Sequence, residues 1–156
     1  MPVAKFAGIF LLALVAQAQA LAQDGPLPGT RTAASPHSFD ATLERLEKSI
    51  EANRMGLVAQ ASASRGATAR KVKIPGNAVL MVFRNDYAVR MLASSIPAGM
   101  EAPIRIYVTE AADGKTSVTW RTPSALFAPY GSPGVNALAR ELDPIFEKII
   151  ADALAR

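Results

Sequence analysis

The chain has 156 residues, of which 50% are hydrophobic and 19% charged, a composition that suits one globular domain and leaves no room for a second. Its 17 Lys and Arg and 13 Asp and Glu are scattered, so no basic stripe typical of a nucleic-acid-binding protein is visible. The absence of Cys excludes disulfides, thiolate metal sites and Cys nucleophiles.

The N-terminus has the pattern of a cleaved signal peptide. Lys5 precedes the apolar run 6–15, and Ala20-Leu21-Ala22 is a sequence that signal peptidase accepts. The alternative is an uncleaved anchor, but the run is short compared with the roughly 20 residues of a membrane-spanning helix. We therefore expect a signal peptide at residues 1–22 and a periplasmic or secreted protein with no stable membrane span after cleavage.

Residues 23–35 are rich in Pro, Gly and small polar residues, which indicates a flexible segment whose end forms a first strand at most. A single domain is expected over 36–156. It opens with an amphipathic helix over 39–54, because Ser38 can cap it and Leu43, Leu46 and Ile50 recur at helical spacing.

Residues 57–64 alternate small apolar and other side chains, which predicts a weak strand. The segment 65–73 that follows is basic and interrupted by Gly, and it has two interpretations. It either binds an anion or an anionic surface, or it is a solvated loop, and the second interpretation is favoured because runs of charge are usually solvated.

The most apolar stretch after the N-terminal run is 78–84, a predicted central strand with both faces apolar. Val79, Met81 and Phe83 lie on one face, and Leu80 and Val82 on the other. Helices usually cover one face of so small a sheet, so the other face needs a second cover. We assign Leu80 and Val82 to this outer face.

A helix follows this strand, with Asn85 or Asp86 as its cap. Val89, Leu92 and Ile96 form its apolar stripe, and Pro97 ends it.

A β-hairpin over 102–123 is predicted from apolar and polar alternation on both sides of one Gly-containing turn. The register that keeps all apolar residues on one face pairs Val108 with Val118 and Ile106 with Trp120. It leaves a three-residue loop, 112–114, in which Gly114 takes the left-handed conformation.

The hairpin register also has consequences for the outer face. It sets Arg105 opposite Arg121 and Tyr107 opposite Thr119. Facing like charges are destabilising, so either an anion lies between the two arginines or their side chains splay into water, and the second reading is favoured.

The C-terminal part contains a short helix through Phe127, a broken connection, and a long helix from about Asn136 with an apolar face at helical spacing. Pro144 interrupts its hydrogen-bond ladder, or else Asp143 caps a second helix that restarts there.

The resulting order is β-α-β(4)-α. Four segments carry a resemblance to the domain of unknown function 302 family: Ser38-Phe39-Asp40-Ala41-Thr42-Leu43-Glu44-Arg45-Leu46, Val82-Phe83-Arg84-Asn85-Asp86, Ala102-Pro103-Ile104-Arg105-Ile106-Tyr107-Val108 and Trp120-Arg121-Thr122-Pro123. The resemblance implies an α+β fold like that of the TATA-binding protein, an antiparallel sheet with helices on one face. It implies no reaction. Similar members read Gly-Asn-Pro where this chain has Arg84-Asn85-Asp86.

Metal, cofactor and catalytic motifs are sparse. His37 is the only His and has no second ligand nearby, so neither a metal site nor a Ser-His-Asp triad is expected. No Gly-rich phosphate loop is present, no cofactor is expected, and no catalytic residue is assigned.

Two functions remain. The first is a non-enzymatic exported module whose outer sheet face forms a homodimer or binds a small anionic ligand. The second is an enzyme for a small anionic substrate, with an Arg105 and Arg121 clamp and Tyr130 or Asp86 for proton transfer. The candidate ligand-binding residues are Arg105, Arg121, Tyr107, Thr119, Asn85 and Tyr130.

Overall fold

The computed structural model describes residues 25–156, so the predicted signal peptide lies outside the described residues. The strands are β1 (Thr30–Ser35), β2 (Gly56–Ala61), β3 (Asn77–Phe83), β4 (Ile104–Glu110) and β5 (Thr116–Arg121). The helices are α1 (Phe39–Ala52), α2 (Ala63–Ala69), α3 (Asn85–Ser94), α4 (Pro123–Phe127) and α5 (Pro133–Leu154), with short 3-10 helices η1 (Pro97–Glu101) and η2 (Ala128–Tyr130).

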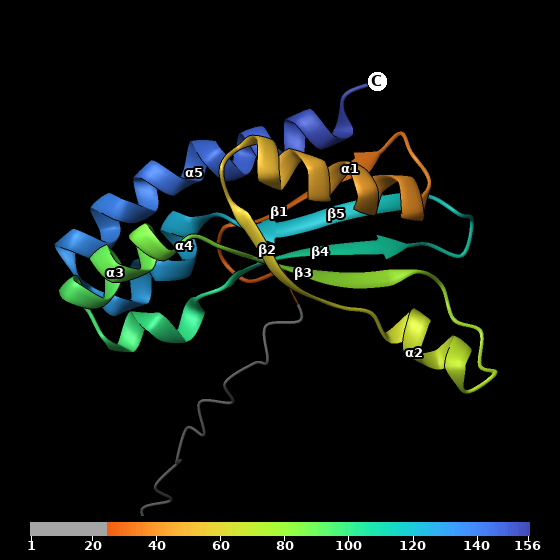
Figure 1. Cartoon of the computed structure of the whole chain (residues 1–156), viewed down its shortest axis with the longest axis horizontal. Helices are drawn as coiled ribbons and strands as arrows, with labels where there is room; N and C mark the ends of the chain where they lie inside the picture. Colours follow the sequence, from red (N-terminus) through yellow and green to blue (C-terminus); the bar gives the residue numbers. More distant parts are fainter. Residues whose placement is uncertain (1–24) are drawn as a thin grey trace, which may run out of the picture.

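The strands form one five-stranded antiparallel sheet in the order β1-β5-β4-β3-β2. α1 and α5 lie on one face of it, and α3 and α4 pack against α5 (Figure 1). This arrangement confirms the predicted α+β class, the β-α-β(4)-α order and the placement of the helices on one face.

The hairpin of β4 and β5 has the predicted register. Val108 pairs with Val118 and Ile106 with Trp120, and all four side chains are buried beneath the helices. Gly114 has a φ of 82°, the left-handed conformation in which Gly costs least.

The face assigned to β3 is wrong. Leu80 and Val82 are 0% and 1% exposed, since Leu80 pairs with Ile106 on the helix-covered face. Val79 and Met81 therefore lie on the opposite face, where Met81 pairs with Arg105. Both sets of alternating residues are apolar, so their pattern does not indicate which set the helices cover.

Three further expectations need correction. The domain starts at β1 rather than at residue 36, because the backbone of this small-residue edge strand pairs with β5. Part of the predicted loop 65–73 is α2, which Ser62 caps by accepting from the N–H of Arg65. The stripe of Val89, Leu92 and Ile96 faces solvent, because Met91 is the residue of α3 that is buried.

Polar contacts join the two long helices that cover the sheet. The Ser49 hydroxyl donates to the Ile149 carbonyl at 2.9 Å. The Arg45 guanidinium donates at 2.6 Å to the carbonyls of Ala153 and Ala155, which have no partner within the last turn of α5. The predicted cap Ser38 accepts from the Ala41 N–H at the start of α1.

α5 is continuous through Pro144, so the restart at Asp143 does not occur. Asp143 instead accepts from the N–H of Ser124 at 2.8 Å and from its hydroxyl, which caps the first turn of α4 from another helix. Within residues 25–156, no helix combines the length and apolar character needed to cross a bilayer.

Candidate functional site

The face of the sheet away from the helices carries an apolar strip, which we define as Val79, Met81, Phe83 and Tyr107. The three β3 residues are partly exposed and Tyr107 is 43% exposed. Val79 pairs directly with Tyr107, so the strip runs across two central strands. In the part of the chain that the structure describes, α1 and α5 cover the other face of the sheet, and η1 borders the Met81 end of this strip.

The strand on the other side of Tyr107 gives the face a hydroxyl-bearing half. Thr119 pairs with Tyr107, and its hydroxyl lies 2.9 Å from that of Thr32 on β1. The structure therefore brings Arg105, Tyr107 and Thr119 together on one surface, as the sequence predicted. The apolar neighbours of that surface are Met81 and Val79 rather than Leu80 and Val82.

Arg121 is not available for the predicted clamp. Its guanidinium donates to the carbonyl of Pro28 at 3.3 Å and to that of Ala125 at 3.1 Å. These contacts tie the segment before β1 and helix α4 to the end of β5. Arg105 is exposed, and among residues 25–156 it has no acidic partner within 4.0 Å.

A solvent-open hollow of about 310 Å³ lies at one end of the apolar strip, between η1 and the sheet. Its lining includes Met81, Met100, Glu101 and Arg105. Glu101 accepts from the Tyr130 hydroxyl at 3.0 Å. Desolvation, together with this contact to Glu101, raises the pKa of Tyr130. Tyr130 thus reaches the hollow through Glu101, while Glu101 and Arg105 bring both signs of charge to its rim.

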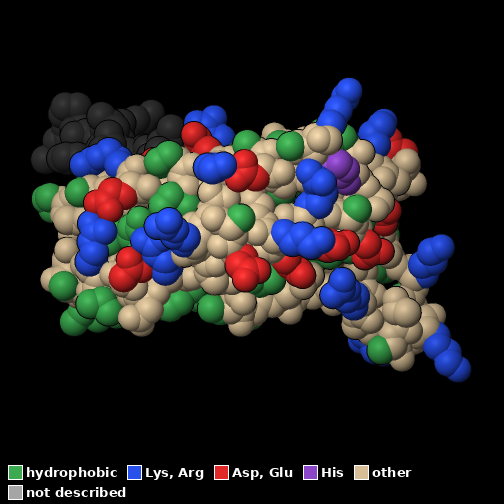
Figure 2. Space-filling view, turned by 45° about the horizontal axis from the view of Figure 1, so that its top comes forward, with side chains coloured by type: hydrophobic (Ala, Val, Ile, Leu, Met, Phe, Trp, Pro, Cys, Tyr) green, Lys and Arg blue, Asp and Glu red, His purple; other side chains and the backbone are tan. Residues whose placement is uncertain are grey.

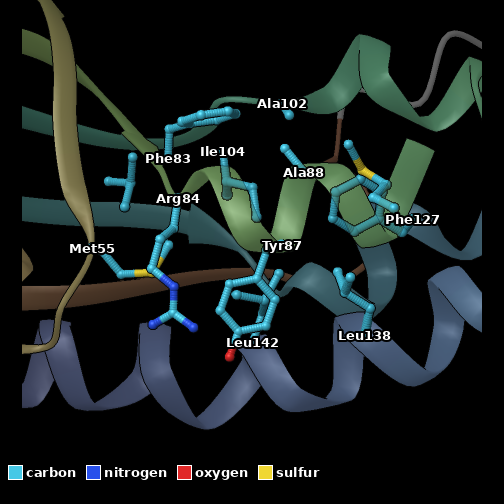
Figure 3. A pocket seen from close by; sticks show the side chains of 12 residues that line it. Met55, Phe83, Arg84, Tyr87, Ala88, Ala102, Ile104, Phe127, Leu138 and Leu142 are labelled. Carbon is cyan, nitrogen blue, oxygen red and sulfur yellow. The ribbon is translucent and has the colours of Figure 1, made fainter. Parts of the chain in front are cut away.

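A second cluster follows the end of β3, and the sequence analysis named its residue Asp86 without predicting the ion pair that it forms with Arg84. Arg84 contacts Asp86 through two hydrogen bonds of 2.7 and 3.0 Å, and its guanidinium lies 4.2 Å from the centroid of the Tyr87 ring (Figure 3). The hydrogen bonds from Arg84 lower the pKa of Asp86. Arg84 and Asp86 are oppositely charged and two positions apart, and this spacing is the sequence signal from which the ion pair could have been predicted.

This cluster continues along α3 into the helix layer. Arg90 makes two hydrogen bonds of 2.7 and 2.8 Å to Glu141 on α5, which lower the pKa of Glu141. The predicted site residue Asn85 is exposed at the first position of α3, whose N-cap is Arg84 and not Asn85 or Asp86. The structure therefore does not bring Asn85 to the outer sheet face.

Beside Arg84 and Tyr87 lies a small apolar cavity of about 30 Å³, between β3, α3 and α5 (Figure 3). Its lining residues include Met55, Met91, Phe127, Leu138 and Leu142. This volume is about that of one water molecule, whereas ligand pockets typically measure roughly 300 to 1,000 Å³. As it stands, the cavity is a packing gap in the core rather than a substrate site.

Residues able to perform acid-base or metal chemistry are dispersed. Over residues 25–156, no Asp or Glu is buried, and no group of three His, Asp or Glu could hold a metal ion. The His37 ring lies 2.9 Å from the Ala155 carbonyl, so it contacts the C-terminal end of α5. Asp86 is exposed and forms an ion pair with Arg84. This arrangement does not support the proton-transfer role considered for Asp86.

Comparison with known proteins agrees with this architecture. The family model described as "Domain of unknown function DUF302" matches residues 31–153. A crystal structure of an uncharacterized conserved DUF302 protein from Bacillus stearothermophilus is similar with a TM-score of 0.72 and 19% sequence identity, covering 81% of this chain and 98% of that one. A search of curated proteins gave no match.

Proposed function

Because the chain belongs to the family of domain of unknown function DUF302, whose name assigns no reaction, we propose its function from its surfaces: it is a non-catalytic module that self-associates through the outer sheet face. The observation that carries this proposal is the apolar strip Val79, Met81, Phe83 and Tyr107, which lies on the face away from α1 and α5 and is partly exposed. Apolar area left in water is stabilised by any partner that removes it from water.

The size of the face is consistent with a weak dimer. Five strands about 4.8 Å apart, each about 20 Å long, give a face of roughly 500 Å². Two such faces together amount to about 1,000 Å², which is the lower limit for specific interfaces. We therefore expect a contact of the weak, reversible class rather than an obligate dimer.

The charges on the face also suit a second copy. A two-fold dimer places the same patch against itself, so a patch with one sign of charge would repel its copy. Here Arg105 and Glu101 border the same hollow. A symmetric contact can therefore set each Arg105 against the Glu101 carboxylate of the other copy.

The test is sedimentation velocity from about 1 μM to about 100 μM, a range that brackets the affinity of a small interface. The wild type should shift toward a dimer with concentration. Met81→Glu should remain monomeric, because the contact would have to remove from water a carboxylate placed inside the apolar strip. Should Met81→Glu fail to fold, the exposed charge reversal Arg105→Glu serves instead and should weaken the dimer.

Val89→Glu is the matched control. Val89 is exposed on α3, in the helix layer, so this variant should dimerise like the wild type. A wild type that is monomeric throughout, or a dimer that Val89→Glu splits and Met81→Glu leaves intact, would contradict the proposal.

The enzyme alternative has less support. Arg121 donates to two backbone carbonyls, and no carboxylate is buried among residues 25–156. A small anion bound at Arg105 remains compatible with the hollow. Isothermal titration with acetate and benzoate, comparing wild type and Arg105→Gln, tests it separately from the dimer.

Export is the second part of the proposal. It rests on Lys5, the apolar run 6–15 and Ala20-Leu21-Ala22. Cleavage after Ala22 would leave every strand intact, since β1 begins at Thr30. The intact mass of protein isolated from a periplasmic fraction should equal that of a chain whose first residue is Gln23 or one of its immediate neighbours. Recovery of a membrane-bound form that retains Lys5 would reverse this part.

A further inference from the structure

Residues 62–76 form a basic lobe, composed of α2 and the loop that leads to β3. The lobe projects at the end of the molecule opposite α3 (Figure 1), and Figure 2 shows blue Lys and Arg side chains on it at the lower right. It contains no Asp or Glu, and its four cations are all exposed: Arg65, Arg70, Lys71 and Lys73. Among the residues that the structure describes, none of the four has an acidic partner within 4.0 Å.

The tip of the lobe has a defined backbone. The N–H of Lys71 donates to the Thr68 carbonyl at 2.9 Å, and that of Val72 to the Ala67 carbonyl at 3.0 Å. These two bonds form a Schellman motif, in which the residue after the cap is left-handed and is usually Gly. Here that residue is Lys71, with a φ of 61°. The tip therefore holds a cation where Gly would cost less.

The base of the lobe is tied to the central strand. The Asn77 side chain accepts from the Ala63 N–H at 3.0 Å, and the Asn77 N–H donates to the Ser64 hydroxyl at 3.2 Å. Ala67 is buried. The lobe is thus a folded projection held on β3.

Exposed apolar side chains alternate with the cations beyond the tip. Val72 is 50% exposed and Ile74 39% exposed, and they flank Lys73. Charge alone would suit any polyanion, but aliphatic side chains gain nothing from a nucleic acid backbone. At a lipid surface they enter the acyl boundary while the cations contact the headgroups.

We propose that the basic lobe docks on the surface of a bilayer that contains anionic phospholipids. Each basic side chain near such a surface contributes about a fivefold increase in partitioning. The four cations together then account for up to several hundredfold, a gain that salt screens over about a Debye length. This surface is separate from the outer sheet face, so either proposal can fail without the other.

The experiment is vesicle co-sedimentation of the full chain, using neutral phosphatidylcholine vesicles and vesicles that also contain phosphatidylglycerol. Because residues 6–15 are apolar and can bind lipid by themselves, the readout is the difference between variants of the same chain. Lys71→Gly with Lys73→Gln should lower partitioning on anionic vesicles about 25-fold, with no change on neutral ones. Lys71→Gly places Gly at the left-handed position, so the fold should be retained.

A charge-matched control and an apolar variant complete the design. Arg31→Gln with Arg140→Gln removes two exposed charges elsewhere and should change partitioning less than twofold. Val72→Ser with Ile74→Ser keeps every cation and should lower anionic-vesicle binding several-fold. Equal binding of wild type and the lysine variant would overturn the proposal. So would a serine variant with unchanged binding, or wild-type binding to duplex DNA as tight as to anionic vesicles, since both outcomes indicate a general polyanion site.

Discussion

The two faces of β3 are equally apolar, yet they have different surroundings. Leu80 and Val82 lie beneath the helices and are inaccessible to water, whereas Val79 and Met81 on the same strand remain partly exposed. The first pair is used in folding, because its burial drives the sheet and helix layers together. The second pair is not needed to hold the sheet and helix layers together, so it forms a surplus of apolar surface on the folded monomer. Such a surplus is the feature that a binding surface requires, and it underlies the proposed self-association.

The largest loss of stability is expected for a substitution on the helix-covered face, at Trp120. This residue is buried opposite Ile106, so Trp120→Ala removes a large core side chain and should cost about 3 to 5 kcal/mol of unfolding free energy. Urea unfolding followed by circular dichroism measures it. An unchanged midpoint would mean that Trp120 is not part of the core and that the face assignment of β5 is mistaken.

Adjacent residues of β3 give the sharpest internal contrast. Leu80→Ala should cost about 2 to 5 kcal/mol because it leaves a cavity beneath the helices. Met81→Ala should cost less than about 1 kcal/mol at monomer concentrations, because its side chain is already partly in water. Paired urea titrations compare the two. Equal losses would remove the distinction between a covered and an open face.

A smaller change in stability is expected when the pH is lowered, and it arises from an ion pair within the helix layer. The hydrogen bonds from Arg90 hold the pKa of Glu141 below its usual 4.5 in the folded protein. The ion pair therefore contributes stability above that pH and loses it as the pH falls through the lowered value. The stability of Glu141→Gln should accordingly fall less than that of the wild type between pH 6 and pH 3, within the small range of a surface pair. Parallel pH profiles of the two proteins would show that the pair adds nothing.

The sequence predicts those parts of the fold where one face is apolar and the other polar. The β4 and β5 hairpin is such a case, and its register was correct to the residue. Ser38 as a cap and Gly114 in the turn were also predictable, because each position requires one kind of local chemistry.

The pattern fails where both sides of an element are apolar. β3 is one example, and α3 is another, because Tyr87 and Met91 face the core while Val89 and Leu92 face water. Contacts between residues that are distant in the sequence likewise cannot be predicted from the local pattern of apolar and polar residues. The cap that Asp143 provides to α4 joins residues 19 positions apart, and Arg121 turns to the carbonyl of Pro28, 93 positions away.

The central claim is that the outer sheet face is the contact surface between two copies. Hydroxyl-radical footprinting at low and high protein concentration tests it most directly, because oxidation of Met81, Phe83 and Tyr107 reports the exposure of the strip itself. We predict that these three residues become several-fold less reactive at concentrations where the dimer forms, while exposed Val89 on α3 stays equally reactive. Oxidation of the strip that is independent of concentration, in a sample that sediments as a dimer, would contradict the claim and place the interface elsewhere.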